Sequence, residues 1–349
     1  MTSEHLMRAV IQDGIGPPEI LQVRNIPRPT QPSGDEVLIH LRAAGVCYHD
    51  LLVRDGTFRH LVQFPLVPGH EMAGDVLAVG EKVSRIKVGD QVASTNRETC
   101  GHCDLCRSGQ EGICPNQVFF GHNGPGAYGE YALVRENALS LVPRSIPPEA
   151  ACMLACAIGT ELHAIRDVGR VKAGNAVLIT GAGGGLGIHG VQLAKLSGAF
   201  VVALTSTAGK AAAIRNAGAD EVVTIARGER FDEKLRAVAP GGFDVICDNV
   251  GEPVFASCFR TLAIGGRYVF VGQLNAFAIS FNPAWLLLRN TALLGSNSCT
   301  RKELDDVIKL VDRGQIKPML DCTLPLDEAA AAHQRVMSAE STGRVVLIP

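Results

Sequence analysis

The stretch AVLITGAGGGLGIHGVQLAKL, residues 176–196, decides the fold of this chain. Residues 176–180 form an apolar run typical of a strand, and residues 186–196 have the pattern of a helix. The glycines between them let the backbone approach a pyrophosphate, which then sits on the exposed N–H groups and the positive dipole end of the helix. The stretch therefore predicts a strand, a dinucleotide-binding loop and a helix. The candidate cofactor-binding residues of this loop are Gly181, Gly183, Gly184, Gly185, Leu186 and Gly187.

The glycines allow two alignments of the loop. Read from Gly181, the loop is one residue longer than the pattern G-x-G-x-x-G, whereas residues 185–190 match that pattern literally. In the second alignment Gly190 would lie inside the helix, so we favour the longer loop. A flexible turn that binds nothing is the alternative. The strand before the loop and the helix after it favour the nucleotide site.

Strands and helices continue to alternate after the loop. Further strands are predicted at residues 200–204, 222–223, 245–246 and 268–271, and helices at residues 210–216 and 231–238. Alternation of this kind builds a doubly wound parallel sheet, so the predicted fold class is α/β.

The chain before this sheet has a different pattern. Residues 8–142 contain short β-branched segments between glycines and prolines, which predict a compact, mostly β domain. A proline-rich stretch at residues 143–148 precedes a helical segment that runs to about Gly169, and we expect a domain boundary there. After about Ser296, a predicted helix at residues 302–312 and short apolar strands are expected to pack back on the first domain.

Length and charge limit the possible functions. The 349 residues exceed what one hydrophobic core usually organises, which also favours two domains. The formal net charge is -2 and there is no Lys/Arg block, so nucleic acids and anionic membranes are not expected partners. The N-terminus lacks a signal-peptide pattern, and no apolar run approaches membrane-spanning length. We therefore expect a cytoplasmic protein that acts on a small-molecule substrate.

Four cysteines lie close together in the sequence, at Cys100, Cys103, Cys106 and Cys114. Four thiolates with this spacing can surround one tetrahedral Zn²⁺, and four protein ligands leave no position open for a substrate. A chance cluster of buried thiols is the alternative. The spacing predicts a structural zinc site, with His102 as a loop residue.

A second set of possible metal ligands is dispersed along the chain and consists of Cys47, His70 and Cys156. One imidazole and two thiolates would form a three-ligand site with room for water or substrate. Spacing alone does not establish this site, because a single His often has a structural role and a free Cys often packs as a small apolar residue.

Taken in order, these residues resemble the zinc-dependent medium-chain dehydrogenase/reductase superfamily of the alcohol dehydrogenase type. The resemblance covers nearly the whole chain and includes Gly69-His70-Glu71, Gly89-Asp90-Gln91-Val92 and Gly343-Arg344-Val345-Val346. It implies a GroES-like, mostly β catalytic domain of residues 1–157, completed by residues 296–349. A Rossmann domain of residues 158–295 would lie between these two parts.

By this resemblance Cys47, His70 and Cys156 are similar to catalytic zinc ligands, and Glu71 to an alternative or nearby ligand. Asp50 resembles a carboxylate that accepts the free N–H of the ligating His, which would fix the tautomer of that His. The alternative for Asp50 is the N-cap of a helix. With the four-cysteine site, the resemblance implies two zinc ions per chain.

The resemblance also implies a nicotinamide cofactor, with Thr160 beside the nicotinamide and Arg344 reaching toward a cofactor phosphate or Glu71. An enzyme that prefers NAD(H) usually places an acidic residue after the second Rossmann strand, but this chain has Thr205 and Ser206 there. Lys210 is positioned to meet a 2′-phosphate, or else is a solvated helix residue. We therefore expect NADP(H) in preference to NAD(H). We also expect the protein to form a homodimer or homotetramer.

The residues next to Cys47 depart from the alcohol-oxidising pattern. His49 stands where relatives carry the Ser or Thr of a proton relay, and Leu52 stands where many carry a second relay His. We predict that His49 itself exchanges a proton with the substrate oxygen, because imidazole changes charge near neutral pH. The alternative is a His that lines the pocket or hydrogen-bonds the ribose. With His49, Asp50 and Glu71 are the candidate catalytic residues.

Three functions are compatible with these patterns. The first is hydride transfer between NAD(P)H and a small aldehyde, ketone or alcohol, with zinc polarising the oxygen. The second is reduction of an activated C=C bond in an enone or enoyl thioester, because some reductases of this type have an aromatic residue where Tyr48 follows Cys47. The third is a non-catalytic, zinc-stabilised structural or interaction protein.

Overall fold

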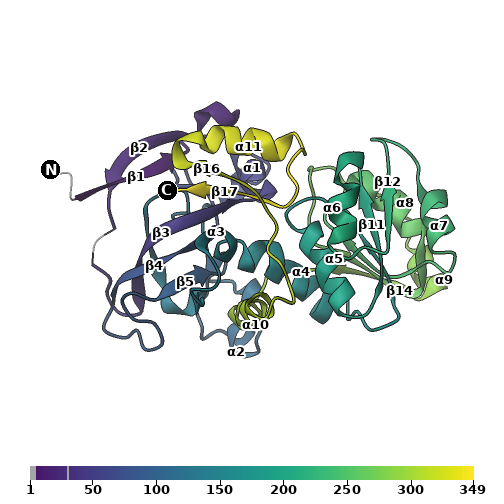
Figure 1. Ribbon diagram of the computed structural model, residues 1–349, viewed down its shortest axis with the longest axis horizontal. Coiled ribbons are helices and arrows are strands. Elements are labelled where there is room, and N and C mark those ends of the chain that lie inside the picture. Colours follow the sequence, from purple (N-terminus) through teal and green to yellow (C-terminus); the bar gives the residue numbers. More distant parts are fainter. Residues whose placement is uncertain (1–4, 30) are drawn as a thin grey trace. The chain divides into compact units, whose positions relative to one another are not determined.

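The computed structural model describes residues 5–29 and 31–349 (Figure 1). The expected start of the first domain at residue 1, and most of the N-terminal stretch tested for a signal peptide, lie outside the described residues. The chain divides into two compact units. The first, called here the β-rich unit, contains Met1–Gly159, Ser298–Gly314 and Leu320–Pro349, and the second, the parallel-sheet unit, contains Thr160–Asn297 and Gln315–Met319.

The second unit includes residues that the sequence division assigned to the first domain. Residues 315–319, expected within 296–349, pack with the parallel-sheet unit. The reason is a set of hydrogen bonds to one helix: Gln192 exchanges two hydrogen bonds with the backbone of Lys317, at 2.8 and 2.9 Å, and His189 Nε2 accepts the N–H of Met319 at 2.9 Å.

The parallel-sheet unit is built on six strands in the order β12-β11-β10-β13-β14-β15, and all neighbours are parallel. The strands are β10 (Ala176–Ile179), β11 (Phe200–Thr205), β12 (Glu221–Thr224), β13 (Phe243–Asp248), β14 (Leu262–Phe270) and β15 (Ala292–Gly295). The chain order reverses between β10 and β13, and ligands of such sheets bind outside the carboxyl ends of the strands at this point. The predicted glycine loop follows β10 directly.

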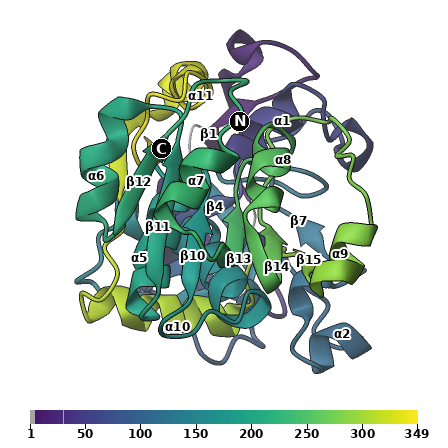
Figure 2. The ribbon, with the colours of Figure 1, turned by 90° about the vertical axis from the view of Figure 1, so that its right-hand side faces the viewer.

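Helices cover both faces of this sheet (Figure 2). They are α5 (Gly187–Leu196) and α6 (Ala211–Asn216) on one face and α7 (Asp232–Val238) and α8 (Glu252–Arg260) on the other, with α9 (Ala284–Arg289) near β14. Because both faces are covered, β11 is buried at every residue after Phe200. The predicted strands and helices of the sheet are confirmed, whereas α8, α9 and β15 were not predicted.

The sheet of the β-rich unit runs in the order β16-β17-β3-β4-β5-β9, and β8 pairs with β3. Its strands are β3 (Glu36–Val46), β4 (Glu71–Val79), β5 (Gln91–Ser94), β8 (Tyr131–Arg135), β9 (Leu139–Leu141), β16 (Leu320–Pro325) and β17 (Arg344–Ile348). Two small sheets pair β1 (Leu6–Ile11) with β2 (Gln22–Pro27) and β6 (Arg97–Glu98) with β7 (Val118–Phe119). The antiparallel pair β17 and β3 joins the C-terminal strand to the N-terminal part of the chain, as Figure 1 shows.

Short helices occupy the connections of the β-rich unit. They are α1 (Tyr48–Arg54), α2 (Asp104–Arg107), α3 (Pro148–Ala151), a π-helix (Leu154–Gly159), α10 (Arg301–Asp312) and α11 (Ala329–Met337). In the parallel-sheet unit α4 (Thr160–Leu162) leads into a second π-helix (His163–Val168). Single 3-10 turns are found at Pro18–Ile20, Arg59–Leu61, Glu111–Ile113, Glu136–Ala138, Ala208–Lys210 and Leu326–Glu328. None of the helices in the described part of the chain is both long enough and apolar enough to span a bilayer.

Candidate functional site

Four buried side chains that are far apart in the sequence meet in the β-rich unit. The ligand atoms of Cys47, His70, Glu71 and Cys156 lie within 4.8 Å of one another. Cys47 follows β3, and Glu71 begins β4, whose residues pair with the end of β3. Cys156 comes from the π-helix. The structure thus brings together the dispersed set that sequence spacing alone left open.

The distances in this cluster fit a tetrahedral metal site. Cys47 Sγ lies 3.9 Å from Cys156 Sγ, and His70 Nε2 lies 3.4 Å from Cys156 Sγ. Two thiolates bound to one zinc at about 2.3 Å would be about 3.8 Å apart in tetrahedral geometry. A hydrogen bond from Cys156, with Arg344 and His70 nearby, holds the pKa of the Cys47 thiol well below its usual value. The thiolate is the form that binds metal, so the donor set fits zinc.

Asp50 orients His70. His70 Nδ1 lies 2.8 Å from Asp50 Oδ1, so this nitrogen carries the proton and Nε2 is left facing the thiols. The backbone N–H of Cys47 donates to Asp50 Oδ2 at 2.9 Å. The expected alternative, Asp50 as an N-cap, is wrong: Cys47 occupies the N-cap of α1, and Asp50 is the third helical residue, whose side chain reaches back. Burial opposes ionisation, but His70 outweighs it and holds the pKa of Asp50 below its usual range.

Arg344 contacts Glu71, which was one of its two expected partners. Arg344 Nη2 lies 3.0 Å from Glu71 Oε1, and Nη1 donates to the carbonyl of Val46 at 3.3 Å. Burial raises the pKa of Glu71 to about 7, although Arg344 acts in the opposite direction. The carboxylate lies against Gly45, where an added Cβ would approach Glu71 Oε2 to 2.0 Å. A glycine at this position therefore makes room for the ion pair.

His49 is hydrogen-bonded to a residue that the sequence did not single out. His49 Nε2 lies 2.7 Å from His122 Nε2, and the rings stack with centroids 4.8 Å apart. The rings of Phe58 and Phe119 also stack on His49, and the ring of His70 lies edge-on. Burial lowers the pKa of His49 to about 4 and that of His122 to about 3. At neutral pH both rings are therefore uncharged, and one donates its proton to the other. The expectation that the His49 imidazole changes charge near neutral pH is wrong, because burial moves its titration to a more acidic pH.

The surroundings of Leu52 and of Asn96 are simple. Leu52 is buried in α1 and carries no imidazole. The second imidazole beside His49 comes from His122 instead. Asn96 is buried and accepts hydrogen bonds from Ser298 Oγ at 2.8 Å and from Arg97 Nε at 3.0 Å. A histidine in the loop Gly121-His122-Asn123-Gly124 has no informative spacing to the ligands, which explains why sequence reasoning missed it.

The four-cysteine segment forms a second cluster around α2. The Sγ atoms of Cys100, Cys103, Cys106 and Cys114 lie within 4.8 Å of one another, with Cys100–Cys114 at 3.6 Å and Cys103–Cys114 at 3.9 Å. Backbone N–H groups of the segment point at three of the sulfurs. Such N–H donors stabilise thiolates, so this donor set fits a closed tetrahedral zinc site. His102 Nδ1 donates to the carbonyl of Cys100 at 2.8 Å within its own loop, and His102 lies outside the cluster.

The glycine loop of the parallel-sheet unit has the features that a phosphate-binding turn needs. Gly181 has φ +59°, a conformation that favours glycine, and an added Cβ on Gly187 would lie 2.4 Å from the carbonyl of Gly181. α5 begins at Gly187, and Gly190 lies inside it, as the longer-loop alignment expects. An added Cβ on Gly183 would meet the Lys210 side chain at 2.5 Å. Lys210 therefore lies against the loop.

The remaining cofactor candidates lie in the same unit. Thr205 ends β11, is buried, and accepts the N–H of Thr207 at 3.1 Å, while Ser206 is exposed. Thr160 is buried at the start of α4. At the carboxyl end of β13, Asp248 accepts the hydroxyl of Thr180 at 2.6 Å and two backbone N–H groups. Sequence reasoning missed Asp248, because no motif marks it.

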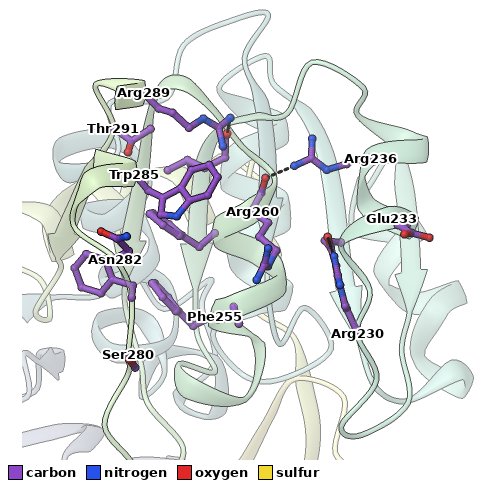
Figure 3. Close-up of a pocket in the computed structure, with 15 residues that line it drawn as sticks. Arg230, Glu233, Arg236, Phe255, Arg260, Ser280, Asn282, Trp285, Arg289 and Thr291 are labelled. Atoms are coloured by element: carbon purple, nitrogen blue, oxygen red, sulfur yellow. Dashed lines mark hydrogen bonds and ion pairs between the residues drawn. The ribbon is translucent and has the colours of Figure 1, made fainter. Parts of the chain in front are cut away.

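A separate pocket of about 530 Å³ lies on the α7, α8 and α9 side of the parallel-sheet unit (Figure 3). Its arginines are largely engaged with the protein. Arg230 pairs with Asp232 at 2.7 Å, Arg236 donates to the carbonyl of Arg260 at 2.5 Å, and Arg289 donates to that of Leu262. None of the candidate site residues lines the pocket, and we assign it no ligand.

Comparisons with known proteins show to which family the chain is similar. Residues 33–144 match the alcohol dehydrogenase GroES-like domain, and residues 185–313 match the zinc-binding dehydrogenase domain. An acryloyl-coenzyme A reductase of Sulfurisphaera tokodaii is 31% identical over 344 residues, which cover 98% of this chain and 100% of the relative. An NAD-dependent alcohol dehydrogenase of Saccharolobus solfataricus is 33% identical, covering 98% and 100%. The crystal structure of AibC has a TM-score of 0.92 and 38% identity, covering 99% of this chain and 97% of that chain.

Proposed function

Because the chain belongs to the zinc-type medium-chain dehydrogenase/reductase superfamily of oxidoreductases, we propose that it transfers a hydride between a nicotinamide cofactor and a small aldehyde, ketone or alcohol. The observation that carries this proposal is the buried cluster of Cys47, His70 and Cys156 with Asp50 behind His70. Three ligands with an oriented imidazole are the donor set of a catalytic zinc site.

In the proposed site Cys47, His70 and Cys156 hold the zinc ion, which when bound acts as a Lewis acid that polarises a carbonyl oxygen. Asp50 keeps the His70 tautomer that presents Nε2 to the metal. Glu71, beside the ligands and paired with Arg344, is available as an alternative ligand. Arg344 thus belongs to the metal site in this proposal, and its expected contact with a cofactor phosphate is set aside.

His49 is the proposed group that exchanges a proton with the substrate oxygen. Its ring contacts the rings of both His70 and His122, and the Nε2–Nε2 hydrogen bond gives the proton a second acceptor. A neutral His49 can take the proton of an alcohol and share it with His122 without an additional hydroxyl in the relay. This arrangement supports His49 as a catalytic residue and extends the proposal to His122.

The four cysteines around α2 are the proposed ligands of a second, structural zinc, which brings the total to two per chain. The cluster has no open position and is formed by residues close together in the sequence. Its role would be to hold residues 100–114 in one conformation. The free energy of metal binding then contributes directly to folding.

For the cofactor we propose a preference for NADP(H). Thr205 and Ser206 stand where an acidic residue would bind the ribose hydroxyls of NAD(H), and the Lys210 side chain lies against the glycine loop. The glycine loop, with Gly181, Gly183, Gly184, Gly185, Leu186 and Gly187, is the proposed pyrophosphate site, and Thr160 is the proposed neighbour of the nicotinamide.

A second candidate function is reduction of the C=C bond of an enoyl thioester. It is favoured by the similarity to an acryloyl-coenzyme A reductase over 98% of this chain and by Tyr48 after Cys47. Hydride addition to a conjugated C=C bond also places negative charge on a carbonyl oxygen. The same electrophilic site therefore serves either reaction, and the residues around it do not choose between them. A purely structural protein would have no use for the open three-ligand cluster.

We also propose that the chain forms a homodimer or homotetramer. The helix α9 exposes Leu287 and Leu288, at 82% and 79%, beside Trp285 at 51%, and β15 is the outer strand of its sheet. Exposed apolar side chains grouped on one short helix favour burial against a second copy. Light scattering should give two or four chains per particle, and Leu287→Glu with Leu288→Glu should lower that number. A wild-type monomer would contradict the proposal.

The function is tested by following nicotinamide absorbance with zinc-loaded enzyme. A panel of aldehydes, ketones, enones and acryloyl thioesters is offered with NADPH and, separately, with NADH. The first proposal expects the highest kcat/KM with an aldehyde or ketone, and the second expects it with the thioester. Absence of turnover on every member, with two zinc ions bound, would favour the non-catalytic protein.

A further inference from the structure

The hydrogen bonds around Asp50 extend beyond the proposed metal ligands to the C-terminal helix. The hydroxyl of Tyr128 lies 3.0 Å from Asp50 Oδ2, and His333 Nε2 lies 3.4 Å from the Tyr128 hydroxyl. His333 belongs to α11 and is 205 residues from Tyr128 in the sequence. A continuous chain therefore leads from His333 through Tyr128 and Asp50 to His70.

The donors in this chain can be assigned from chemistry. Asp50 is ionised and only accepts, so His70 Nδ1, the N–H of Cys47 and the Tyr128 hydroxyl all donate to it. The single proton of the phenol is thus used, and His333 must donate its Nε2–H to the phenol oxygen. His333 Nδ1 is then an unprotonated nitrogen, and no group in the described residues donates to it. Every hydrogen bond in the series from His333 through Tyr128 to Asp50, and the one from His70, is therefore donated toward Asp50.

Packing fixes the position of Tyr128 as well. Its ring covers Gly69, the residue before His70, where an added Cβ would lie 2.3 Å from Tyr128 Cδ1. The N–H of Tyr128 donates to the carbonyl of Pro68 at 3.0 Å, and that of Ala127 donates to Gly69 at 3.0 Å. Tyr128 therefore contacts both the backbone that leads to His70 and the carboxylate that orients its ring.

A merely apolar core would not need these polar groups. Tyr128 and His333 are both 0% exposed, and burying a phenol and an imidazole costs free energy unless they are hydrogen-bonded. Among the residues that the structure describes, the side-chain hydrogen bonds of this pair lead only to one another and to Asp50. A Phe and a Leu would fill similar space without this cost.

We propose that Tyr128 and His333 are positioning residues that act through Asp50 to set how tightly the Cys47, His70 and Cys156 site holds zinc. This inference rests on the proposed metal site. The Tyr128 hydroxyl fixes the plane of the Asp50 carboxylate, and His333 fixes the hydroxyl. With the chain intact, the His70 ring is held in the orientation in which Nε2 meets the metal. Loss of a group that orients a ligating His typically weakens metal binding by about 10–100-fold.

The first experiment removes only the hydroxyl of Tyr128. Zinc-loaded wild type, Tyr128→Phe and the control Tyr131→Phe are mixed with a chromophoric chelator, and zinc release is followed with time. Tyr131 lies in β8 and stacks on His40, away from the cluster. The phase that belongs to the catalytic site is the one missing from Cys156→Ala. We expect this phase to be about tenfold faster in Tyr128→Phe and unchanged in Tyr131→Phe.

The second experiment tests whether His333 acts through Tyr128. His333→Leu should speed the same phase, whereas His333→Gln, which keeps a donor, should restore most of the wild-type rate. The double variant Tyr128→Phe with His333→Leu should release zinc no faster than Tyr128→Phe alone. Once the Tyr128 hydroxyl is lost, His333 is no longer connected to Asp50, so its replacement has no further effect. Independent packing effects would add instead. The comparison of His333→Leu with His333→Gln also keeps the proposal testable if Tyr128→Phe folds poorly.

Two results would overturn the inference: equal zinc release in wild type and Tyr128→Phe, or additive effects of the two substitutions. Failure of the proposed metal site looks different, because wild-type protein would then lack the release phase that Cys156→Ala removes. In the expected case the release of zinc from the four-cysteine cluster is the same in every variant.

Discussion

His49 Nε2 lies 2.7 Å from His122 Nε2, so two imidazoles separated by 73 residues in the sequence share one proton beside the buried cluster of thiols and His70. Burial holds both rings in the neutral form at neutral pH, with pKa values of about 4 for His49 and about 3 for His122. A neutral pair of this kind can accept a proton from a substrate hydroxyl and return it in the reverse reaction.

His49→Gln should lower kcat by about 10²–10⁴-fold, the usual contribution of a general acid or base. Gln keeps a polar side chain of similar reach but cannot take up the proton. The rate is compared with that of His60→Gln, an exposed histidine of the same unit, after both variants have been shown to hold wild-type zinc. Near-normal turnover of zinc-loaded His49→Gln would reduce His49 to a residue that lines the pocket.

The pH profile gives an independent test of the same group. Because burial lowers the pKa of His49 to about 4, its neutral form predominates at every pH above that value. Alcohol oxidation, which needs the neutral form, should therefore show no His49 limb between about pH 5 and 8 and should fall only near the lowered pKa. A limb near pH 6.5 that disappears in His49→Gln would show that the imidazole titrates as an unburied histidine does.

Cys103→Ala should harm folding more than chemistry. Loss of one of four ligands removes most of the metal-binding free energy, which in a structural site is folding free energy. We expect a fall in Tm of several degrees and about one zinc fewer per chain, with kcat of the remaining folded protein little changed. Cys322→Ala, which is outside both clusters, serves as the control. An unaltered Tm in Cys103→Ala would rule out a structural zinc there.

Lys210→Gln should weaken the preference for NADPH. The Lys210 side chain packs on Gly183, and Gln keeps part of that packing while removing the charge that would meet a 2′-phosphate. We expect kcat/KM with NADPH to fall about tenfold, as an interaction of about 1.4 kcal/mol requires, while kcat/KM with NADH changes little. Lys172→Gln, at an exposed position, is the control. A wild-type enzyme that uses NADH as well as or better than NADPH would contradict the preference.

Glu161 should make the protein less stable as the pH rises. Both carboxylate oxygens of Glu161 are buried, and burial raises the pKa of this carboxyl from 4.5 to about 7, although the neighbouring Asn249 side chain acts in the opposite direction. Between those values the folded state binds more protons than the unfolded state, so stability present below pH 4.5 is lost as the pH rises through 7. The loss is about 3 kcal/mol at about 1.4 kcal/mol per pKa unit.

Glu161→Gln imitates the protonated carboxyl and should therefore raise Tm above about pH 7.5 and leave it unchanged below about pH 5. Thermal unfolding is measured across this range for wild type, Glu161→Gln and the exposed control Glu233→Gln. If Glu161→Gln raised Tm equally at both ends of this pH range, the Glu161 carboxyl would not change its protonation state within it.

Local patterns predicted those parts of the molecule that depend on neighbouring residues. The strand, glycine loop and helix at residues 176–196 form one continuous segment, and the four cysteines from Cys100 to Cys114 meet within one short loop. The α8 helix was missed because Pro253 and the short apolar pattern gave no clear period, and the exchange of residues 315–319 between units depends on Gln192 and His189.

Contacts between distant segments could not be predicted in the same way. The pairing of β17 with β3 brings Arg344 to Glu71, but no spacing in the sequence connects residues so far apart. His122, Tyr128 and His333 belong to no motif and acquire their partners only when the loops and α11 pack around α1. Resemblance to a family identified the dispersed ligands and Asp50, which orients His70, whereas the roles of Tyr128 and His333 required the structure.

The most direct test of the proposed zinc-dependent hydride transfer is the initial rate of nicotinamide oxidation as a function of zinc bound per chain. Enzyme depleted by a chelator under conditions that spare the four-cysteine cluster is titrated with zinc, with Cys156→Ala treated in parallel. We predict that wild-type turnover rises from near zero in proportion to the second zinc ion, and that Cys156→Ala gains neither this ion nor turnover. Full turnover with only the structural zinc bound would contradict catalysis at the Cys47, His70 and Cys156 site.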